Sequence, residues 1–473
     1  MIKVPSDDDR VLVAKIHEAA QDQVFALWDR LSAEEQASLL SQLHALNLPK
    51  LRKLVAQFLQ GAQEINEARV LSPAPVLGLP RTDDERAREA QARAAGEDAL
   101  RQGRIGIVTA AGEAGWGSSA DCPRGLCPIG PVSGKSLFCL FAETIRALGK
   151  RYRTTLPWII VASPGNRDAI GAHFREADHF GLNRAEVMFL TQAELPVVNR
   201  RGKILLAEPG RLAMSPDGHG GVLLALLRDD ETFHSLEVRE LEHLFYFQVD
   251  NPLVRIADPT FLGYHILQSC DLSSKTVRKK EPEEKVGVFC QFNGTLGVVE
   301  HSELSAEDRT RRDGGGQLEF SAANIAVHAL SIGFLRRLKE AGIELPCHFV
   351  ERKTPYIDRK GCRVQPRQPN SIQFASFVFD TLRFARSTLV LEARRDEEFS
   401  PVKAETGADS LATARRDLSR RYARWLRAAG AQMDPHRPDV EPIEISPLFA
   451  LDAEELKEKL PAPPGVVPGF HLR

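Results

Sequence analysis

Apolar residues near the start of the chain recur every three or four positions, which is the spacing of one face of a helix. The recurring positions are Val11, Ile16, Val24, Leu27, Leu39, Leu43 and Leu46. Ser32 followed by Glu35 is typical of a capping box at the start of a helix. The pattern therefore predicts two or three amphipathic helices between residues 11 and 59.

The next segment has a different character. Pro73, Pro75 and Pro80 indicate a connector, and the charged run from Asp83 to Arg101, rich in Ala, Arg and Glu, predicts one solvated helix. Together with the helices before it, this segment leads us to expect a helical N-terminal region over residues 1–100.

Strand-like and helix-like patterns alternate after residue 100. Short β-type runs at 104–110 and 157–162 are followed by helical patterns at 137–148 and 167–174, and further strand-like runs occur at 187–190 and 244–249. Such alternation is typical of parallel βαβ units, whose carboxyl ends open onto a ligand crevice. The predicted fold class is α/β, with a mixed, mostly parallel Rossmann-like sheet.

The rest of the chain adds a hairpin, more helices and a tail. Residues 286–300 form two β-type runs about Asn293-Gly294, the strongest short-range hairpin signal. Helices are predicted at 323–341 and 411–429, and four prolines between 461 and 468 predict an irregular end. We expect a central α/β domain over residues 101–405 and a small C-terminal region over 406–473.

Composition narrows the class of protein. The 473 residues are 43% hydrophobic and 27% charged, which fits a soluble globular protein. Lys and Arg number 62 against 64 Asp and Glu, a net charge of −2, whereas a general grip on nucleic acid or an anionic membrane needs a basic excess. We expect neither as a partner, so an anionic ligand must be held by local charges.

Cysteine usage and the first residues bear on the compartment. The seven cysteines are scattered without CxxC pairs, which favours reduced thiols and implies no zinc site. The opening MIKVPSDDDRVLVAK is acidic where a secretory signal is basic, and no apolar run approaches the length of a membrane span. The expected location is the cytoplasm.

Two glycine-containing segments suggest phosphate binding. Residues 109–117 follow a predicted strand, but they fail as a dinucleotide fingerprint because the next strand lacks an acid for a ribose. Residues 130–136 miss the P-loop spacing by one position. Lys135 nevertheless stands at a predicted helix start, where its charge and free amides would hold an anion; the competing interpretation is an exposed lysine.

A longer series of segments resembles the UDP-sugar pyrophosphorylases, particularly the eukaryotic-type UDP-N-acetylglucosamine pyrophosphorylases. The matching segments stand in the order of that family and cover roughly residues 106 to 448: 128–138, 195–196, 215–221, 249–259, 285–288, 298–303, 369–370, 377–380, 397–403 and 444–448. The resemblance implies a nucleotide-sugar transferase fold and a Mg²⁺-assisted reaction. In that reaction UTP and a sugar 1-phosphate, either N-acetylglucosamine 1-phosphate or glucose 1-phosphate, give a UDP-sugar and pyrophosphate.

The resemblance also implies roles for individual residues. Asp250 matches the position that holds magnesium, and Arg124 and Lys403 match catalytic positions that contact phosphates. The implied substrate-binding residues are Gly112, Lys135, Gln192, Gly218, His219, Asn251, Glu300 and Asn324. Gln192 would read uracil, and His219, Glu300 and Asn324 would face the sugar. The competing structural interpretations are an Asx turn at Asp250, a loop histidine at His219 and a helix N-cap near Asn324.

The chain departs from the family pattern in its nucleotide-binding loop. The family arginine there is replaced by Gly115 or, with the alignment shifted by one, by Trp116, and a family lysine is replaced by Arg124. Glu113 would add a negative charge beside a triphosphate. Three hypotheses stay open at this point: a working uridylyltransferase with a rebuilt loop, a protein that binds UDP-sugar or UTP without turnover, and a different enzyme that uses the same crevice.

Overall fold

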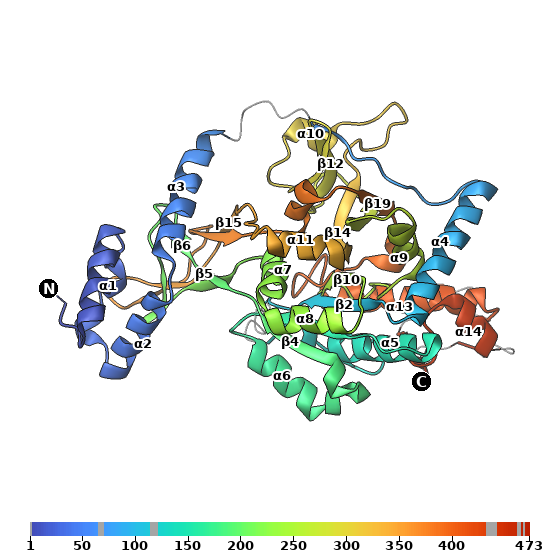
Figure 1. Cartoon of the computed structure of the whole chain (residues 1–473), viewed down its shortest axis with the longest axis horizontal. Coiled ribbons are helices and arrows are strands. Elements are labelled where there is room, and N and C mark those ends of the chain that lie inside the picture. Colours follow the sequence, from blue (N-terminus) through green and yellow to red (C-terminus); the bar gives the residue numbers. More distant parts are fainter. Residues whose placement is uncertain (1, 65–70, 114–121, 432–441, 461–464, 467–468) are drawn as a thin grey trace. The chain divides into compact units, whose positions relative to one another are not determined.

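The computed structural model describes residues 2–64, 71–113, 122–431, 442–460, 465–466 and 469–473 (Figure 1). The chain divides into two compact units. The first unit combines residues 1–69, 192–221 and 344–378, and the second combines 70–191, 222–343 and 379–473. Each unit is therefore assembled from separated stretches, and these bounds differ from the three consecutive regions expected from the sequence.

The N-terminal helices belong to the first unit and agree with the apolar spacing. They are α1 (Asp7–Glu18), α2 (Ala33–His44) and α3 (Leu48–Glu64). The capping box is confirmed, because the Ser32 side chain accepts from the Glu35 amide and the Glu35 carboxylate accepts from the Ser32 amide. Ile16, Leu39 and Leu43 are fully buried in the core of this unit.

Three small sheets complete the first unit. The strands are β5 (Glu194–Pro196), β6 (Val198–Asn199), β7 (Leu206–Glu208), β8 (Arg211–Leu212), β9 (Met214–Pro216), β15 (His348–Arg352), β16 (Tyr356–Ile357), β17 (Arg363–Val364) and β18 (Ser371–Ala375). They pair in the orders β15-β18-β6, β17-β16-β7-β8 and β5-β9. Ile372 and Phe374 of β18 and Val198 of β6 pack against the N-terminal helices.

The large sheet lies in the second unit and confirms the expected mixed α/β fold. Its strands are β1 (Leu71–Pro73), β2 (Ile105–Ala110), β3 (Trp158–Ala162), β4 (Val187–Thr191), β10 (His243–Gln248), β11 (Leu272–Arg278), β12 (Val288–Phe292), β13 (Thr295–Val299), β14 (Ala322–Ser331) and β19 (Thr388–Glu392). The run β10-β2-β3-β4 is parallel throughout, and β11 pairs in parallel with β19. β14 pairs antiparallel with β10, β11 and β12.

The second unit also contains helices. They include α5 (Leu137–Tyr152), α6 (Arg167–Glu176), α8 (Asp230–Val238), α9 (Pro259–Leu267), α10 (Ala306–Thr310), α12 (Arg395–Glu398) and α13 (Leu411–Ala428); α7 (His219–Arg228) begins in the first unit and continues into the second. Alternate residues of β3 such as Trp158 and Ile160 pack with Phe138 of α5 and Phe174 of α6 in one core. The carboxyl ends of such parallel strands lie at one edge of the sheet, and the loops that follow them commonly hold binding and catalytic residues.

The hairpin prediction is confirmed by β12 and β13, which pair antiparallel around Asn293 and Gly294. Asn293 has a φ of 49° and Gly294 a φ of 85°. Both angles lie in the left-handed region, which Gly and Asn adopt at lower cost than other residues. The turn residues therefore account for the register of this hairpin.

The helix predicted at 323–341 is wrong in its first half. Residues 322–331 form the strand β14, and only residues 332–340 form a helix, α11 (Ile332–Glu340). Ala323, Ile325, Val327 and Ala329 pack into one hydrophobic core with a period of two, which is the spacing of a strand. The helix begins only where the Ser331 side chain caps the Phe334 amide.

The charged helix α4 (Asp83–Arg101) has the predicted bounds but is not solvated on every side. A Cβ on Gly96 would lie 1.9 Å from the Pro259 carbonyl oxygen, and one on Gly263 would lie 1.6 Å from the Ala92 carbonyl oxygen. Glycine is thus required at both positions because α4 and α9 approach backbone to backbone. The charged composition of α4 concealed this buried face.

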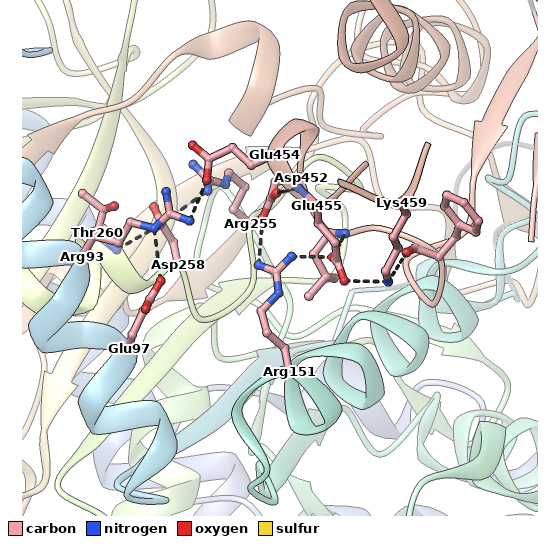
Figure 2. A network of polar contacts seen from close by, with 12 residues as sticks. Arg93, Glu97, Arg151, Arg255, Asp258, Thr260, Asp452, Glu454, Glu455 and Lys459 are labelled. Atoms are coloured by element: carbon pink, nitrogen blue, oxygen red, sulfur yellow. Dashed lines mark hydrogen bonds and ion pairs between the residues drawn. The ribbon is translucent and has the colours of Figure 1, made fainter. Parts of the chain in front are cut away.

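Within the second unit, ion pairs connect the C-terminal part of the chain to α4 and α5. Figure 2 shows Arg151 of α5 beside Asp452 and Glu455, and Arg93 of α4 beside Glu454, around α14 (Ala453–Lys459). Two short strands, β20 (Ile443–Ile445) and β21 (Phe470–Leu472), pair in parallel. The end of the chain is thus a strand rather than wholly irregular, and the four prolines lie outside the described residues. Among the residues described, no helix is both long and apolar enough to cross a membrane.

Candidate functional site

The carboxyl ends of β2 and β10 bring three charged side chains together. Asp250 follows β10, is 5% exposed, and lies with its Oδ2 3.7 Å from Nη1 of Arg124. Arg124 also forms an ion pair with Glu113, which follows β2. Because β2 and β10 are neighbours in parallel register, the residues after them meet at one edge of the sheet. The structure therefore brings the predicted magnesium residue and a predicted phosphate residue to one place.

Lys403 reaches the same place from a distant part of the chain. The Val402 amide donates to the Asp250 carbonyl oxygen at 2.8 Å, so the segment of Lys403 runs beside the segment of Asp250. The Lys403 side chain is exposed. The structure thus brings Lys403, Arg124 and Asp250 together, as the resemblance implies.

Asn251 connects these two segments. It is 2% exposed. Its side-chain Nδ2 donates to the Glu398 carbonyl oxygen at 2.8 Å, and its Oδ1 accepts from the Ser400 backbone amide at 3.2 Å. These bonds give Asn251 a bracing role, and its predicted contact with substrate stays a prediction.

The electrostatic environment of Asp250 suits a cationic ligand. Burial raises the pKa of Asp250 above its ordinary value, Lys403 and Arg124 lower it, and Glu113 raises it. A buried carboxylate in this state gains from a further cation nearby. Among the described residues, no group of three or more His, Cys, Asp or Glu side chains is arranged to hold a metal. Mg²⁺ in nucleotide sites takes one or two carboxylates together with phosphate oxygens, so the single Asp250 carboxylate fits this ion.

The loop at residues 130–135 holds an internal carboxylate. The Val132 and Ser133 amides and the Ser133 hydroxyl all donate to Glu444, which is fully buried, at 2.6–2.8 Å. Nζ of Lys135 donates to Glu143 of α5 at 2.5 Å. The loop therefore binds an anion through its backbone amides, and that anion is a protein side chain. Lys135 has a structural partner, and its phosphate contact stays a prediction.

The predicted nucleotide loop is described only in its first part. Gly112 follows β2 and is buried. The side-chain Nδ2 of Asn166 donates to the Ala111 carbonyl oxygen at 2.8 Å and so fixes the start of the loop. Gly115 and Trp116, the two candidates for the missing arginine, lie outside the described residues. Asn166 had no role in the sequence analysis, although an Asn next to a predicted helix start was a signal for such a brace.

Three predicted binding residues lie in the first unit. Gln192 is 3% exposed, and its Nε2 donates to Asp217 Oδ1 at 3.1 Å and to the Gly218 carbonyl oxygen at 3.0 Å. Gly218 has a φ of 84°, and a Cβ there would lie 2.4 Å from the Ser376 carbonyl oxygen. Glycine is therefore needed at this position for close packing of the backbone.

His219 lies beside these residues in the same unit. Its ring stacks on Phe377 with centroids 4.7 Å apart, and its Nδ1 accepts from the Val378 amide at 3.1 Å. Because Nδ1 is an acceptor, the proton of the neutral ring is on Nε2. His219 is thus an ordered residue with a defined tautomer, and its contact with a sugar stays a prediction.

Glu300 and Asn324 meet at Gly287. The Asn324 amide donates to the Gly287 carbonyl oxygen at 2.8 Å, and Oε1 of Glu300 lies 2.9 Å from the place that a Cβ on Gly287 would take. Asn324 stands in β14, so the competing N-cap interpretation is wrong, as is the expectation that it opens a helix. The structure brings together these two residues, which were predicted to face the sugar.

Comparison with known proteins shows the family to which the chain belongs. The sequence profile of the family described as UTP–glucose-1-phosphate uridylyltransferase matches residues 50–468. The chain belongs to the UDP-sugar pyrophosphorylase family. It is 35% identical to the human UDP-N-acetylhexosamine pyrophosphorylase-like protein 1, over 94% of this chain and 93% of that protein. It is 31% identical to UDP-N-acetylglucosamine pyrophosphorylase of Saccharomyces cerevisiae, over 93% and 95%.

Solved structures of UDP-sugar pyrophosphorylases are similar as well. The uridine diphosphate N-acetylglucosamine pyrophosphorylase of Trypanosoma brucei, solved with an inhibitor, has a TM-score of 0.79 at 25% identity and covers 99% of each chain. A putative UDP-N-acetylglucosamine pyrophosphorylase of Entamoeba histolytica has a TM-score of 0.74 at 26% identity, with 85% of this chain and 100% of that chain covered. The resemblance in sequence and the expected fold are both confirmed.

The sequence analysis missed a buried charged cluster behind the site. Lys275 of β11 is 1% exposed, and it donates to Asp258 and Glu398, which are also buried. Asp258 and Glu398 stand in two of the segments that match the family, but Lys275 stands outside them. A lysine within a strand of small and apolar residues, Leu272–Arg278, was the signal that could have found this cluster.

Proposed function

We propose that this protein is a UTP:sugar-1-phosphate uridylyltransferase, which converts UTP and a sugar 1-phosphate into a UDP-sugar and pyrophosphate. The observation that carries the proposal is the cluster of Asp250, Arg124 and Lys403 at the carboxyl end of β10, in a member of this family. The name of the yeast relative makes N-acetylglucosamine 1-phosphate the first substrate to test, and the N-acetylhexosamine in the name of the human relative is compatible with that choice. The family description makes glucose 1-phosphate the second.

The proposed reaction is an in-line displacement at phosphorus. A phosphate oxygen of the sugar 1-phosphate attacks the α-phosphorus of UTP, and the bond from that phosphorus to the pyrophosphate oxygen breaks. Both reactants are anions, so catalysis depends mainly on placing them together and neutralising charge. Arg124 and Lys403 would contact the phosphates. Asp250 would hold Mg²⁺, which neutralises phosphate charge when it is bound.

The altered loop is compatible with this reaction. Glu113 pairs with Arg124, whose side chain is only 15% exposed, so the negative charge of Glu113 is partly compensated by the protein. Arg124 in turn lies 3.7 Å from Asp250. An arginine held between two carboxylates keeps its planar fork in place for a phosphate. This arrangement supports the rebuilt loop as a working alternative to the family pattern.

The resemblance implies that Gln192 reads uracil and that His219 faces the sugar. Nε2 of Gln192 is already bonded to Asp217 and Gly218, so Oε1 is the atom of this side chain that would accept a hydrogen bond from a uracil N–H. His219 would offer its Nε2–H to a hydroxyl. The resemblance also assigns Glu300 and Asn324, which both approach Gly287, to the sugar.

A location in the cytoplasm belongs to the same proposal. All seven cysteines lie in the described part of the chain and remain as thiols. Thiols of this kind are typical of proteins in a reducing compartment.

The experiment that tests the function is a pyrophosphate assay. The protein is incubated with Mg²⁺, UTP and either sugar 1-phosphate, pyrophosphate is measured continuously, and the UDP-sugar is identified by mass spectrometry. We expect turnover that EDTA abolishes and added Mg²⁺ restores. If no pyrophosphate forms while a UDP-sugar still raises the melting temperature, the protein binds the nucleotide sugar without turnover and the proposal is wrong.

A further inference from the structure

A buried lysine joins two carboxylates behind the candidate site. Lys275 is 1% exposed, and its Nζ donates to Asp258 Oδ2 at 2.7 Å and to Glu398 Oε1 at 2.5 Å. Nη2 of Arg255 lies 3.9 Å from Asp258 Oδ1, and Figure 2 shows this arginine beside Asp258. Two cations therefore balance two carboxylates. Burying such charges is costly, so the cluster is better explained by the geometry that it fixes than by stability alone.

The two carboxylates stand on the segments that carry the proposed catalytic groups. Asp258 ends the stretch that begins at Asp250, and it caps α9 by accepting from the Thr260 amide at 3.2 Å. Glu398 ends α12 and precedes Lys403 on the same stretch. The bonds from Lys275 to Asp258 and Glu398 thus hold the two stretches together at the ends that lie away from Asp250 and Lys403 in the sequence.

Near Asp250 and Lys403, the two stretches are connected by hydrogen bonds that involve backbone groups. The Val402 amide donates to the Asp250 carbonyl oxygen at 2.8 Å, and Asn251 bonds to the Glu398 carbonyl oxygen and the Ser400 amide. The Arg255 amide also donates to Glu398 Oε2 at 3.3 Å. A shift of either stretch would therefore be transmitted to the spacing of Asp250 and Lys403.

We propose that Lys275 is a positioning residue, whose ammonium fixes the two segments that carry Asp250 and Lys403 and so sets the placement of these groups for uridylyl transfer. The inference rests on the proposed function. It requires no contact between Lys275 and a substrate. Small displacements of reacting groups are known to cost large factors in rate, so a residue that fixes this spacing has a direct effect on turnover.

The charge state of the cluster agrees with this role. Burial raises the pKa of Asp258, but Lys275 and Arg255 outweigh burial and hold that pKa at about 2. Asp258 is therefore ionised at neutral pH and remains a firm acceptor for Lys275. Burial raises the pKa of Glu398. Removing Lys275 alone would leave two buried carboxylates without their cation, which would destabilise the fold and obscure any effect on placement.

The test therefore uses, beside the single variant, a triple variant in which Lys275, Asp258 and Glu398 are all replaced by uncharged side chains. Lys275→Met alone is expected to lower the melting temperature, and Lys275→Met with Asp258→Asn and Glu398→Gln is expected to recover most of that loss. The amide oxygen introduced at position 258 would still cap α9, and the one introduced at position 398 would still accept from the Arg255 amide. Arg337→Met, which breaks the 2.6 Å ion pair with Asp271 elsewhere in the second unit, is the matched control.

Turnover and amide exchange are the two measurements. In the folded triple variant we expect kcat to fall about 10–100-fold with the KM for UTP changed by less than about 3-fold. Hydrogen exchange at Ser400 and Val402 is expected to quicken by at least about 10-fold, while the Ala111 amide, bonded to the Val161 carbonyl oxygen, stays protected. Arg337→Met is expected to change the melting temperature and neither of these measurements.

Three results would overturn the inference: a triple variant with wild-type kcat, one whose Ser400 and Val402 exchange is unchanged, or a control that loses kcat equally. If the wild-type protein forms no pyrophosphate, the proposed function fails, and the exchange comparison between wild type and triple variant then decides the role of Lys275 by itself. Unchanged exchange overturns that role, and quickened exchange at the two amides supports it.

Discussion

Two regions of the second unit carry donors for an anion, and they differ in how far protein carboxylates already occupy those donors. In the loop at residues 130–135, the donors are bonded to the buried carboxylates of Glu444 and Glu143. In the Asp250 cluster, the cations are Arg124, which meets Glu113 and Asp250, and the exposed Lys403. The first region resembles a phosphate loop more closely in sequence, yet its donors bind protein carboxylates. We call this region, the loop at residues 130–135 with Glu444 and Glu143, the clasp.

The contrast shows that residue type and spacing do not distinguish a clasp from a ligand site. A donor that is bonded to a buried carboxylate would have to give up that bond before it could hold a phosphate, at a cost of about 1–3 kcal/mol or more for a charged group. The exposed Lys403 has no such cost, whereas Arg124 is shared with Glu113 and Asp250. Substitutions in the clasp should therefore change stability, and substitutions in the Asp250 cluster should change rate.

The largest effect is expected for Asp250→Asn. Pyrophosphate formation should fall by roughly 10²–10³-fold, because the variant loses the carboxylate proposed to hold Mg²⁺ and with it part of the charge neutralisation. The melting temperature should not fall, since burial raises the pKa of Asp250 and a neutral side chain is tolerated there. Asp168→Asn, an exposed acid of α6, makes the same change in net charge and should keep its rate. A variant that unfolds without a fall in rate would place Asp250 with the clasp.

Glu444→Gln should produce the opposite result. The fully buried carboxylate accepts from two amides and one hydroxyl, and its neutral replacement weakens all three bonds. We expect the free energy of unfolding to fall by about 1.5–3 kcal/mol, measured by urea denaturation. The rate of the folded enzyme at 25 °C should remain close to wild type. A large fall in rate at unchanged stability would show that the loop takes part in ligand binding, and the contrast would fail.

Lys135→Met tests the prediction that this lysine contacts phosphate. If the contact with Glu143 is its whole role, stability should fall by about 1–3 kcal/mol because a buried carboxylate loses its cation. The KM values for UTP and for the sugar 1-phosphate should then change by less than about 2-fold, a difference of only ~0.4 kcal/mol in binding. Steady-state kinetics with each substrate varied in turn provide the measurement. A rise of 10-fold or more in either KM, about 1.4 kcal/mol, would return Lys135 to the ligand site.

Local patterns in the sequence were enough to predict much of the fold. The alternating strands and helices from β2 to α6, the Asn293-Gly294 hairpin and the capped helices of the first unit each depend on residues that are close in the chain. The error at β14 has a local cause as well. The strand residues that pack into the core at every second position run directly into the helical spacing of α11, so one apolar run contains two periods.

The partners of the charged groups could not be predicted in this way. Glu444 meets the Val132 amide across 312 positions, and Glu398 meets Lys275 across 123. No periodicity in either segment encodes such a pairing, because it arises only when the sheet has brought distant segments together. The resemblance to a family led us to expect Asp250, Arg124 and Lys403 near one another, but the bonds of Lys275 and those around Glu444 could be found only in the structure.

The smallest effect is expected for Glu113→Gln, and it tests the contrast most finely. The Glu113 side chain is 61% exposed, so its pair with Arg124 contributes no more than about 1 kcal/mol to stability. Its charge also lies near enough to Asp250 to raise the pKa of that group, and it would repel a bound triphosphate. We therefore expect the KM for UTP to fall by about 2–5-fold at low salt and by less at high salt. Glu176→Gln, an exposed acid of α6, should leave KM unchanged.

A rise in the KM for UTP in the Glu113→Gln variant instead would mean that Arg124 needs Glu113 to hold its position. In that case, the donors of the Asp250 cluster would also depend on protein carboxylates, and the two regions would differ in degree of exposure rather than in kind.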